Sequence, residues 1–146
     1  MSLERICGKT VVTISPDATV LDAAKLMQSQ HIGSLVVIDE FRPIGMLTDR
    51  DIVLKLVANE KKPGETAVKS IMTANPTMVN VNYDVLDAVR LMRNRGVRRL
   101  PVVDEHRHLI GIITMDDVLA AFGTEVGDLA GAVQKEFYLE REGSTA

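Results

Sequence analysis

The chain has 146 residues, a formal net charge of −3, 46% hydrophobic residues and 25% charged residues. This composition is typical of a globular protein of one ordinary domain or two small interdependent ones, and the aromatic content of 3% predicts a core of aliphatic side chains. The acidic balance excludes a general attraction to nucleic acid or to acidic membranes, so any anion site must be local.

Cysteine content and apolar runs indicate the compartment. Cys7 is the only cysteine, which leaves no partner for an internal disulfide or a thiolate zinc pair. The first residues lack the basic and then apolar order of a signal peptide, and no apolar run approaches the ~18 residues of a membrane span. We therefore expect a cytoplasmic protein without a membrane partner.

The chain from Glu4 to Phe122 is one unit written twice. Residues 20–51 align with residues 85–117 with 15 identities in 32 positions, once a single inserted residue near His108 is allowed for. Self-similarity at a fixed period is the sequence signature of a repeat architecture. The predicted division is 4–58 for the first copy, 59–68 for a polar linker with a Pro-Gly turn, 69–122 for the second copy and 124–141 for a C-terminal helical extension.

Each copy changes its hydrophobic period in the same order, which predicts strand, helix, strand, strand and helix. Apolar residues recur at i, i+3, i+4 and i+7 from Val20 and from Val85, and Thr19 and Asp84 precede these helices as capping residues. The predicted segments are 12–14, 20–27, 35–38, 44–47 and 51–57 in the first copy, and 77–79, 85–92, 100–103, 109–113 and 117–122 in the second.

The extension after the repeat is also amphipathic. Its apolar residues fall on one helical stripe, made by Val126, Leu129, Ala130, Val133 and Phe137. Such a stripe needs a surface to cover, which is either the core of this chain or a second chain.

A glycine and threonine motif occurs once in each copy, where a strand turns into a helix. It reads Gly45-Met46-Leu47-Thr48-Asp49-Arg50-Asp51 in the first copy and Gly111-Ile112-Ile113-Thr114-Met115-Asp116-Asp117 in the second. One interpretation is a capping box, in which the threonine and the last aspartate satisfy amide donors of the new helix. The other is a nucleotide site, with phosphate at the helix start, ribose on the aspartate and a ligand close to the glycine. Local geometry alone favours the capping box.

The doubled unit resembles a tandem pair of CBS domains, the cystathionine β-synthase type modules. The resemblance rests on the two copies of the motif and on the run Leu100-Pro101-Val102-Val103-Asp104, and it covers essentially Glu4 to Phe122. It implies an α+β fold of two pseudo-symmetric βαββα repeats packed through their sheets, with the C-terminal helix as an addition. It also implies clefts for adenosine-containing ligands such as AMP, ADP, ATP, NAD or S-adenosylmethionine.

The resemblance further implies two composite clefts, with aspartate holding the ribose and threonine the phosphate. The first cleft, closed by the motif of the first copy, would be lined by Met46, Thr48, Arg50, Asp51, Pro76, Thr77, Val97, Arg98, Gly33 and Ser34. The second cleft, closed by the motif of the second copy, would be lined by Val11, Val12, Ile32, Gly33, Arg98, Arg99, Ile112, Thr114, Asp116 and Asp117.

The two clefts are not expected to be equivalent. The first has Arg50 where the second has Asp116, and the second receives Arg98 and Arg99 where the first receives Gly33 and Ser34. Arginine pairs with phosphate, whereas an added carboxylate repels it. These exchanges predict clefts that differ in affinity or in phosphate number.

Other polar groups carry less chemistry. His106 and His108 are interpreted as turn residues and not as a metal site, and Arg90 and Arg93 as a solvated helix face. No nucleophile with a base partner and no phosphate-loop lysine motif is present, so we expect no enzyme, no catalytic residue and no catalytic cofactor.

The expected function is that of a stand-alone regulatory module. It binds an adenosine-containing ligand, forms a homodimer and signals in trans to an unknown protein partner by changing its geometry. The alternative is a nucleic-acid-binding or structural protein without a physiological nucleotide ligand, for which the arginine cluster near residues 90–99 would be the surface.

Overall fold

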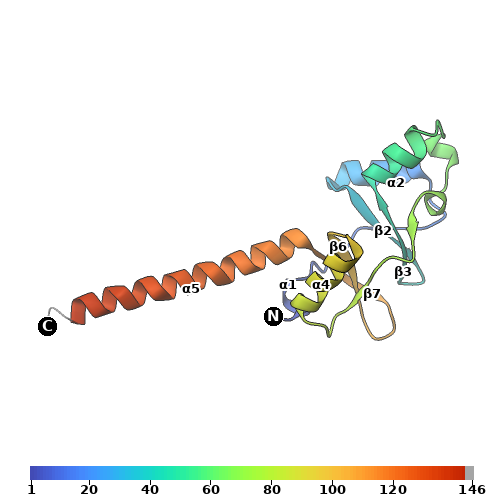
Figure 1. Cartoon of the computed structure of the whole chain (residues 1–146). Coiled ribbons are helices and arrows are strands. Elements are labelled where there is room, and N and C mark those ends of the chain that lie inside the picture. The colour runs from blue at the N-terminus through green and yellow to red at the C-terminus, as the bar shows by residue number, and fades with distance from the viewer. Residues whose placement is uncertain (144–146) are drawn as a thin grey trace.

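The computed structural model describes residues 1–143, which form two similar lobes and one long helix that projects from them (Figure 1). The elements are α1 (Leu3–Ile6), β1 (Thr13–Ile14), α2 (Val20–Gln30), β2 (Ser34–Asp39), β3 (Arg42–Thr48), α3 (Asp49–Asp51), η1 (Ile52–Val57), η2 (Pro63–Glu65), η3 (Val68–Ser70), β4 (Thr73–Ala74), β5 (Val79–Asn80), α4 (Val85–Arg95), β6 (Arg99–Val103), β7 (Leu109–Thr114) and α5 (Met115–Gly143). The predicted α+β fold of two repeats with a C-terminal helix is confirmed.

Each lobe contains one sheet. In the first lobe β1 runs parallel to β2, β2 pairs with β3 in an antiparallel hairpin, and β4 completes the order β1-β2-β3-β4. In the second lobe β5, β6 and β7 repeat the first three strands with the same directions. The hairpins even share an irregularity, since the register shifts between Val37 and Ile38 and between Val102 and Val103.

The helices α2 and α4 begin at the predicted capping residues. The Thr19 side chain accepts a hydrogen bond from the Asp22 amide at 3.1 Å, and Asp84 forms a capping box with Asp87. At the other end, Gly96 closes α4 in the left-handed conformation with φ of 64°. His31 takes the same conformation after α2, with φ of 54°.

Each copy begins with a lead-in segment, residues 3–12 in the first copy and 68–78 in the second. This segment crosses over and packs against the other copy. Leu3 and Cys7, from the start of the first copy, are buried in the hydrophobic core of the second lobe, and Val68 and Ile71 are buried in the core of the first. Backbone pairing follows the same exchange, because Gly8 and Ile112 share two hydrogen bonds of 2.9 Å and β4 pairs with β3. Neither core is therefore complete without residues of both copies.

The motif glycines make room for this exchange. A Cβ atom at Gly111 would lie 2.9 Å from the Gly8 carbonyl oxygen and 3.1 Å from the Cys7 sulfur. A Cβ atom at Gly45 would overlap the Met72 side chain and lie 3.1 Å from the Thr73 oxygen. These contacts explain both glycines without a ligand, since segments of the other copy fill the space that a side chain would need.

The last helices of the two copies differ. In the first copy α3 continues into the π-helical segment η1, where the Ala58 amide donates to the Val53 carbonyl. In the second copy α5 does not stop at Phe122 but continues without a break to Gly143, pointing away from both lobes (Figure 1). No helix within residues 1–143 meets the length and hydropathy that crossing a bilayer requires.

The apolar stripe of the extension does not pack on the core of this chain. Val126, Leu129, Val133 and Phe137 are between 53% and 68% exposed, and Val118 is the only residue of α5 that is buried. Of the two surfaces that the sequence left open for this stripe, the chain's own core is thereby excluded.

Candidate functional site

Both motifs form the capping box. The Asp51 amide donates to the Thr48 hydroxyl oxygen at 3.1 Å, and the Thr48 amide donates to Asp51 Oδ2 at 3.0 Å. Thr114 and Asp117 repeat these bonds at 3.1 and 3.0 Å. Each threonine oxygen serves here as an acceptor, so its hydroxyl proton is still available to donate to a ligand. Capping and ligand binding are thus compatible at the same residues.

The two motif aspartates are in different electrostatic surroundings. Asp51 Oδ1 lies 3.1 Å from Lys55 Nζ, which also donates to the Ile71 carbonyl oxygen at 3.1 Å. The repeat places Ala121 at the position of Lys55. Within residues 1–143 no ion pair reaches Asp117. The carboxylate of the first motif is therefore neutralised by a partner that the second motif lacks.

The first cleft is a cavity of about 680 Å³ between the lobes. Eight of the ten residues expected there line it, namely Met46, Thr48, Arg50, Asp51, Pro76, Thr77, Val97 and Arg98. Gly33 and Ser34, also expected there, line the second cleft. The sequence interpretation missed Thr73, Asn75, Arg95, Gly96 and Arg99.

The second cleft is smaller, at about 300 Å³. Seven of the ten expected residues line it, namely Val11, Val12, Ile32, Gly33, Arg99, Ile112 and Thr114. Arg98 lines the first cleft instead, and Asp116 and Asp117 follow Thr114 without lining either cavity. Thr10, Ser34 and Val36 were not foreseen in this cleft.

The crossing of the lead-in segments explains this distribution. Each cleft combines the motif of one copy with the lead-in segment and the helix–strand junction of the other copy. The repeat aligns Val11 with Pro76 and Gly33 with Arg98. Val11 and Gly33 line the second cleft together, so pseudo-symmetry places their counterparts Pro76 and Arg98 together in the first cleft. This alignment of the two copies is the sequence signal from which the correct assignment of residues to clefts follows.

The two clefts differ in the charge of the residues that line them. Four arginines line the first cleft, Arg50, Arg95, Arg98 and Arg99, against one carboxylate. Among the described residues only Arg98 of the four has an ion pair, 3.4 Å from Asp116, and both side chains are exposed, at 70% and 84%. Such a pair contributes little to stability. The first cleft therefore presents a strongly cationic lining.

The lining of the second cleft carries little charge. Arg99, which reaches it from between the cavities, is the one cationic residue in its lining. The Asp49 carboxylate lies directly against Gly33, with Oδ2 only 2.8 Å from the position that a Cβ atom would take. The two clefts thus differ in charge, which gives the predicted inequality a structural basis. Both arginines were expected in the second cleft, but Arg98 lines only the first cleft and Arg99 lines both.

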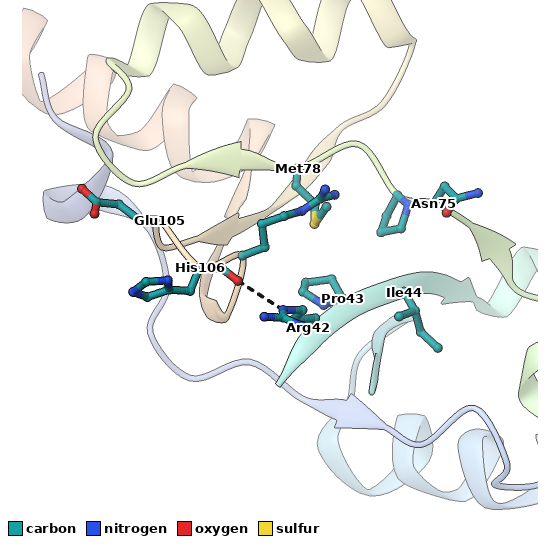
Figure 2. Close-up of a pocket in the computed structure, with 9 residues that line it drawn as sticks. Arg42, Pro43, Ile44, Asn75, Met78, Glu105 and His106 are labelled. Carbon is teal, nitrogen blue, oxygen red and sulfur yellow. Dashed lines mark hydrogen bonds between the residues drawn. The ribbon is translucent and has the colours of Figure 1, made fainter. Parts of the chain in front are cut away.

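A third cavity, of about 600 Å³, lies between the turns of the two hairpins (Figure 2). Arg42 Nε donates across it to the His106 carbonyl oxygen at 3.2 Å, and the Leu109 amide donates to the Phe41 carbonyl at 2.8 Å. Its lining comes from the start of β3, from residues 75–78 and from the turn at 105–107, and neither motif contributes to it. We interpret it as the joint that connects the hairpins.

The remaining polar candidates have structural explanations. Asp104 Oδ1 accepts the amides of His106 and His108 at 2.8 and 2.9 Å, and the hydrogen bond from His108 is the main reason that the pKa of Asp104 is lowered. Burial raises the pKa of the Cys7 thiol, which lies beneath Gly111. No group of three or more potential metal ligands occurs in residues 1–143.

Two pseudo-symmetric lobes that share two composite clefts define a tandem-repeat module. The CBS domain model matches residues 3–58 and 68–124, so the chain belongs to the CBS domain family. It is 38% identical over 108 residues to the CBS domain-containing protein YhcV of Bacillus subtilis, covering 74% of this chain and 76% of that protein. It is 40% identical over 120 residues, or 82% of this chain, to the uncharacterized protein MK0525 of Methanopyrus kandleri, of which it spans 61%.

A solved structure of the same kind carries ligands. The CBS domain pair of protein MJ0100, crystallised with 5′-methylthioadenosine and S-adenosyl-L-methionine, superposes with a TM-score of 0.75 at 27% identity. The match covers 86% of this chain and 98% of that one. Adenosyl compounds are thus ligands of a CBS domain pair with this fold.

Proposed function

We propose that this protein is a regulatory module that binds an adenosine-containing ligand between its two lobes. The observation that carries the proposal is the first cleft, where an aspartate and a threonine from one copy face aliphatic and arginine side chains from the other across about 680 Å³. Small-molecule sites commonly measure ~300–1,000 Å³ and combine apolar walls with a few polar groups. The adenosyl ligands of the MJ0100 domain pair support the same ligand class.

Ligand binding in such a cleft changes the relative position of the two lobes. Because each cleft is built from both copies, a ligand that contacts both walls favours one relative position of the lobes. We propose that a protein partner reads this position in trans. The module itself has no catalytic role and no catalytic cofactor in this proposal, and AMP, ADP, ATP, NAD and S-adenosylmethionine are the ligands to test.

We also propose that the protein forms a homodimer through α5. Every residue from Phe122 to Gly143 is exposed, and Gly123, Gly127 and Gly131 lie inside the helix. Each interior glycine costs about 1 kcal/mol relative to alanine, so this stretch needs packing that the chain itself does not supply. A second copy in antiparallel orientation, centred on Ala130, would set Gly123 opposite Phe137 and Gly127 opposite Val133.

Light scattering tests the homodimer. The wild type should have twice the mass of the chain at micromolar concentration. Val133→Glu places a charge on the stripe and should give a monomer, whereas Thr124→Glu, on the opposite face of α5, should leave the dimer intact. A monomeric wild type would contradict the proposed dimer.

Calorimetry with the five ligands, combined with motif variants, tests the function itself. Asp51→Ala should lose about 1 kcal/mol of stability through the missing cap and should also lose ligand affinity. Asp87→Ala removes an equivalent cap from α4, away from both clefts, so it should lose similar stability and keep the affinity. If the two variants bind equally well, Asp51 is a capping residue only. If no ligand binds the wild type, the proposed function is wrong.

A further inference from the structure

We infer that the two clefts take chemically different ligands: the first takes an adenosine compound that carries phosphate, and the second takes an adenosyl compound without phosphate. The inference rests on the proposed function and adds the ligand class of each cleft. It follows from the way in which charge is divided between two cavities that are built from equivalent segments of the repeat.

The first cleft is built to hold an anion. Arg95, Arg98 and Arg99 come from the end of α4 and the start of β6, and Arg50 comes from the motif of the other copy. A phosphate group carries a charge of about −1.5 to −2 at neutral pH, and guanidinium groups bind it through paired hydrogen bonds. Four arginines that converge from both lobes, of which only Arg98 has an ion pair among the described residues, are therefore best explained by a phosphate between the lobes.

The repeat removes every one of these arginines from the equivalent positions of the second cleft. Gln30, Gly33, Ser34 and Asp116 stand where the first cleft has Arg95, Arg98, Arg99 and Arg50. A side chain at Gly33 would also require the exposed Asp49 carboxylate to move, because its Oδ2 lies 2.8 Å from the position of a Cβ atom there. The second cleft therefore favours an uncharged or cationic adenosyl compound.

The motif aspartates strengthen the division. Lys55 neutralises Asp51 in the first motif, so this carboxylate repels a phosphate less. Asp117 lacks such a partner among residues 1–143, and its neighbour Asp116, which stands where the first motif has Arg50, is paired with Arg98. A phosphate near Thr114 would therefore lie beside a motif aspartate without an ion pair, whereas one near Thr48 lies beside a motif aspartate that is paired with Lys55.

Arg99 couples the two clefts, because it lines both. A phosphate in the first cleft engages this guanidinium and withdraws the one cationic group that the second cleft can use. The chain should therefore bind one phosphorylated ligand, and the second cleft should still accept a phosphate-free adenosyl compound when the first is filled.

Calorimetry with AMP and with 5′-methylthioadenosine tests the inference. For the wild type we expect one AMP per chain, with affinity that falls as salt rises, and one further site for 5′-methylthioadenosine in protein saturated with AMP. Arg50→Gln/Arg98→Gln should weaken AMP at least about tenfold, since hydrogen bonds between charged groups are the strong ones. Binding of 5′-methylthioadenosine should change less than twofold.

Arg90→Gln/Arg93→Gln is the matched control. It removes the same charge from the exposed part of α4, where neither side chain lines a cleft, and should leave AMP affinity within twofold. Two equal AMP sites, or an unchanged AMP affinity in Arg50→Gln/Arg98→Gln, would overturn the division of ligands and leave the proposed function standing. If neither compound binds the wild type at millimolar concentration, the proposed function fails and the inference fails with it.

Discussion

Replacing Gly111 by alanine tests whether the lead-in segment of the first copy packs on β7 of the second copy. The added methyl group would lie 2.9 Å from the Gly8 carbonyl oxygen and 3.1 Å from the Cys7 sulfur. Neither neighbour can move away easily, since Gly8 is held by two backbone hydrogen bonds to Ile112 and Cys7 is buried in the core of the second lobe. The lead-in segment must shift as a whole.

The cost of this shift has two contributions. Overpacking a core costs about 1–3 kcal/mol, and weakening one backbone hydrogen bond adds about 0.5–1.5 kcal/mol. We expect Gly111→Ala to lose about 2–4 kcal/mol of unfolding free energy. In a chain of this size each kcal/mol lowers the melting temperature by about 2–4 °C.

The free energies of unfolding of Gly111→Ala and Gly45→Ala are measured by urea denaturation and compared. At Gly45 the closest neighbour is the flexible Met72 side chain, which can rotate away, so Gly45→Ala should be the milder change. Adding Met72→Ala should recover part of its loss, whereas Cys7→Ala should not rescue Gly111→Ala, because the Gly8 backbone remains in place. A Gly111→Ala variant as stable as the wild type would show that the first lead-in segment does not lie on β7.

Three further changes have defined outcomes. Because burial raises the pKa of Cys7, the folded protein should react with iodoacetamide at pH 8 far more slowly than the urea-unfolded chain, and equal rates would contradict its burial. The lowered pKa of Asp104 means that this carboxylate contributes stability above its unfolded pKa of about 3.9 and loses it as the pH falls, so Asp104→Ala should flatten the acid side of the pH–stability curve. His31→Gly should raise stability by up to about 1 kcal/mol, since glycine adopts a φ of 54° without strain; thermal melting checks this, and a loss would contradict it.

The sequence was most informative where the signal is local. The helix periods and their caps at Thr19 and Asp84 depend on neighbours within one turn, and the structure has both. The crossing of the lead-in segments was not predictable in this way. Leu3 and Cys7 are too few to define a period, and which lobe they enter is decided by packing that only the folded chain has.

The same crossing limited the prediction of the clefts. Residues of the motifs were placed in the correct cavities as far as they line one, but Gly33, Ser34 and Arg98 were placed partly in the wrong ones. The course of α5 was also missed. The helix 117–122 and the extension 124–141 were predicted as separate segments, because the repeat ends at Phe122, whereas the structure has one continuous helix.

A nuclear magnetic resonance titration of the isotope-labelled protein with AMP tests the proposed function most directly, because it reports where a ligand binds. We expect the largest amide shifts at 48, 50, 51 and 96–99, which line the first cleft, and small shifts at 104–108, in the turn beside the third cavity. No shifts at millimolar AMP, or the largest shifts in the turn, would contradict a nucleotide site between the two lobes.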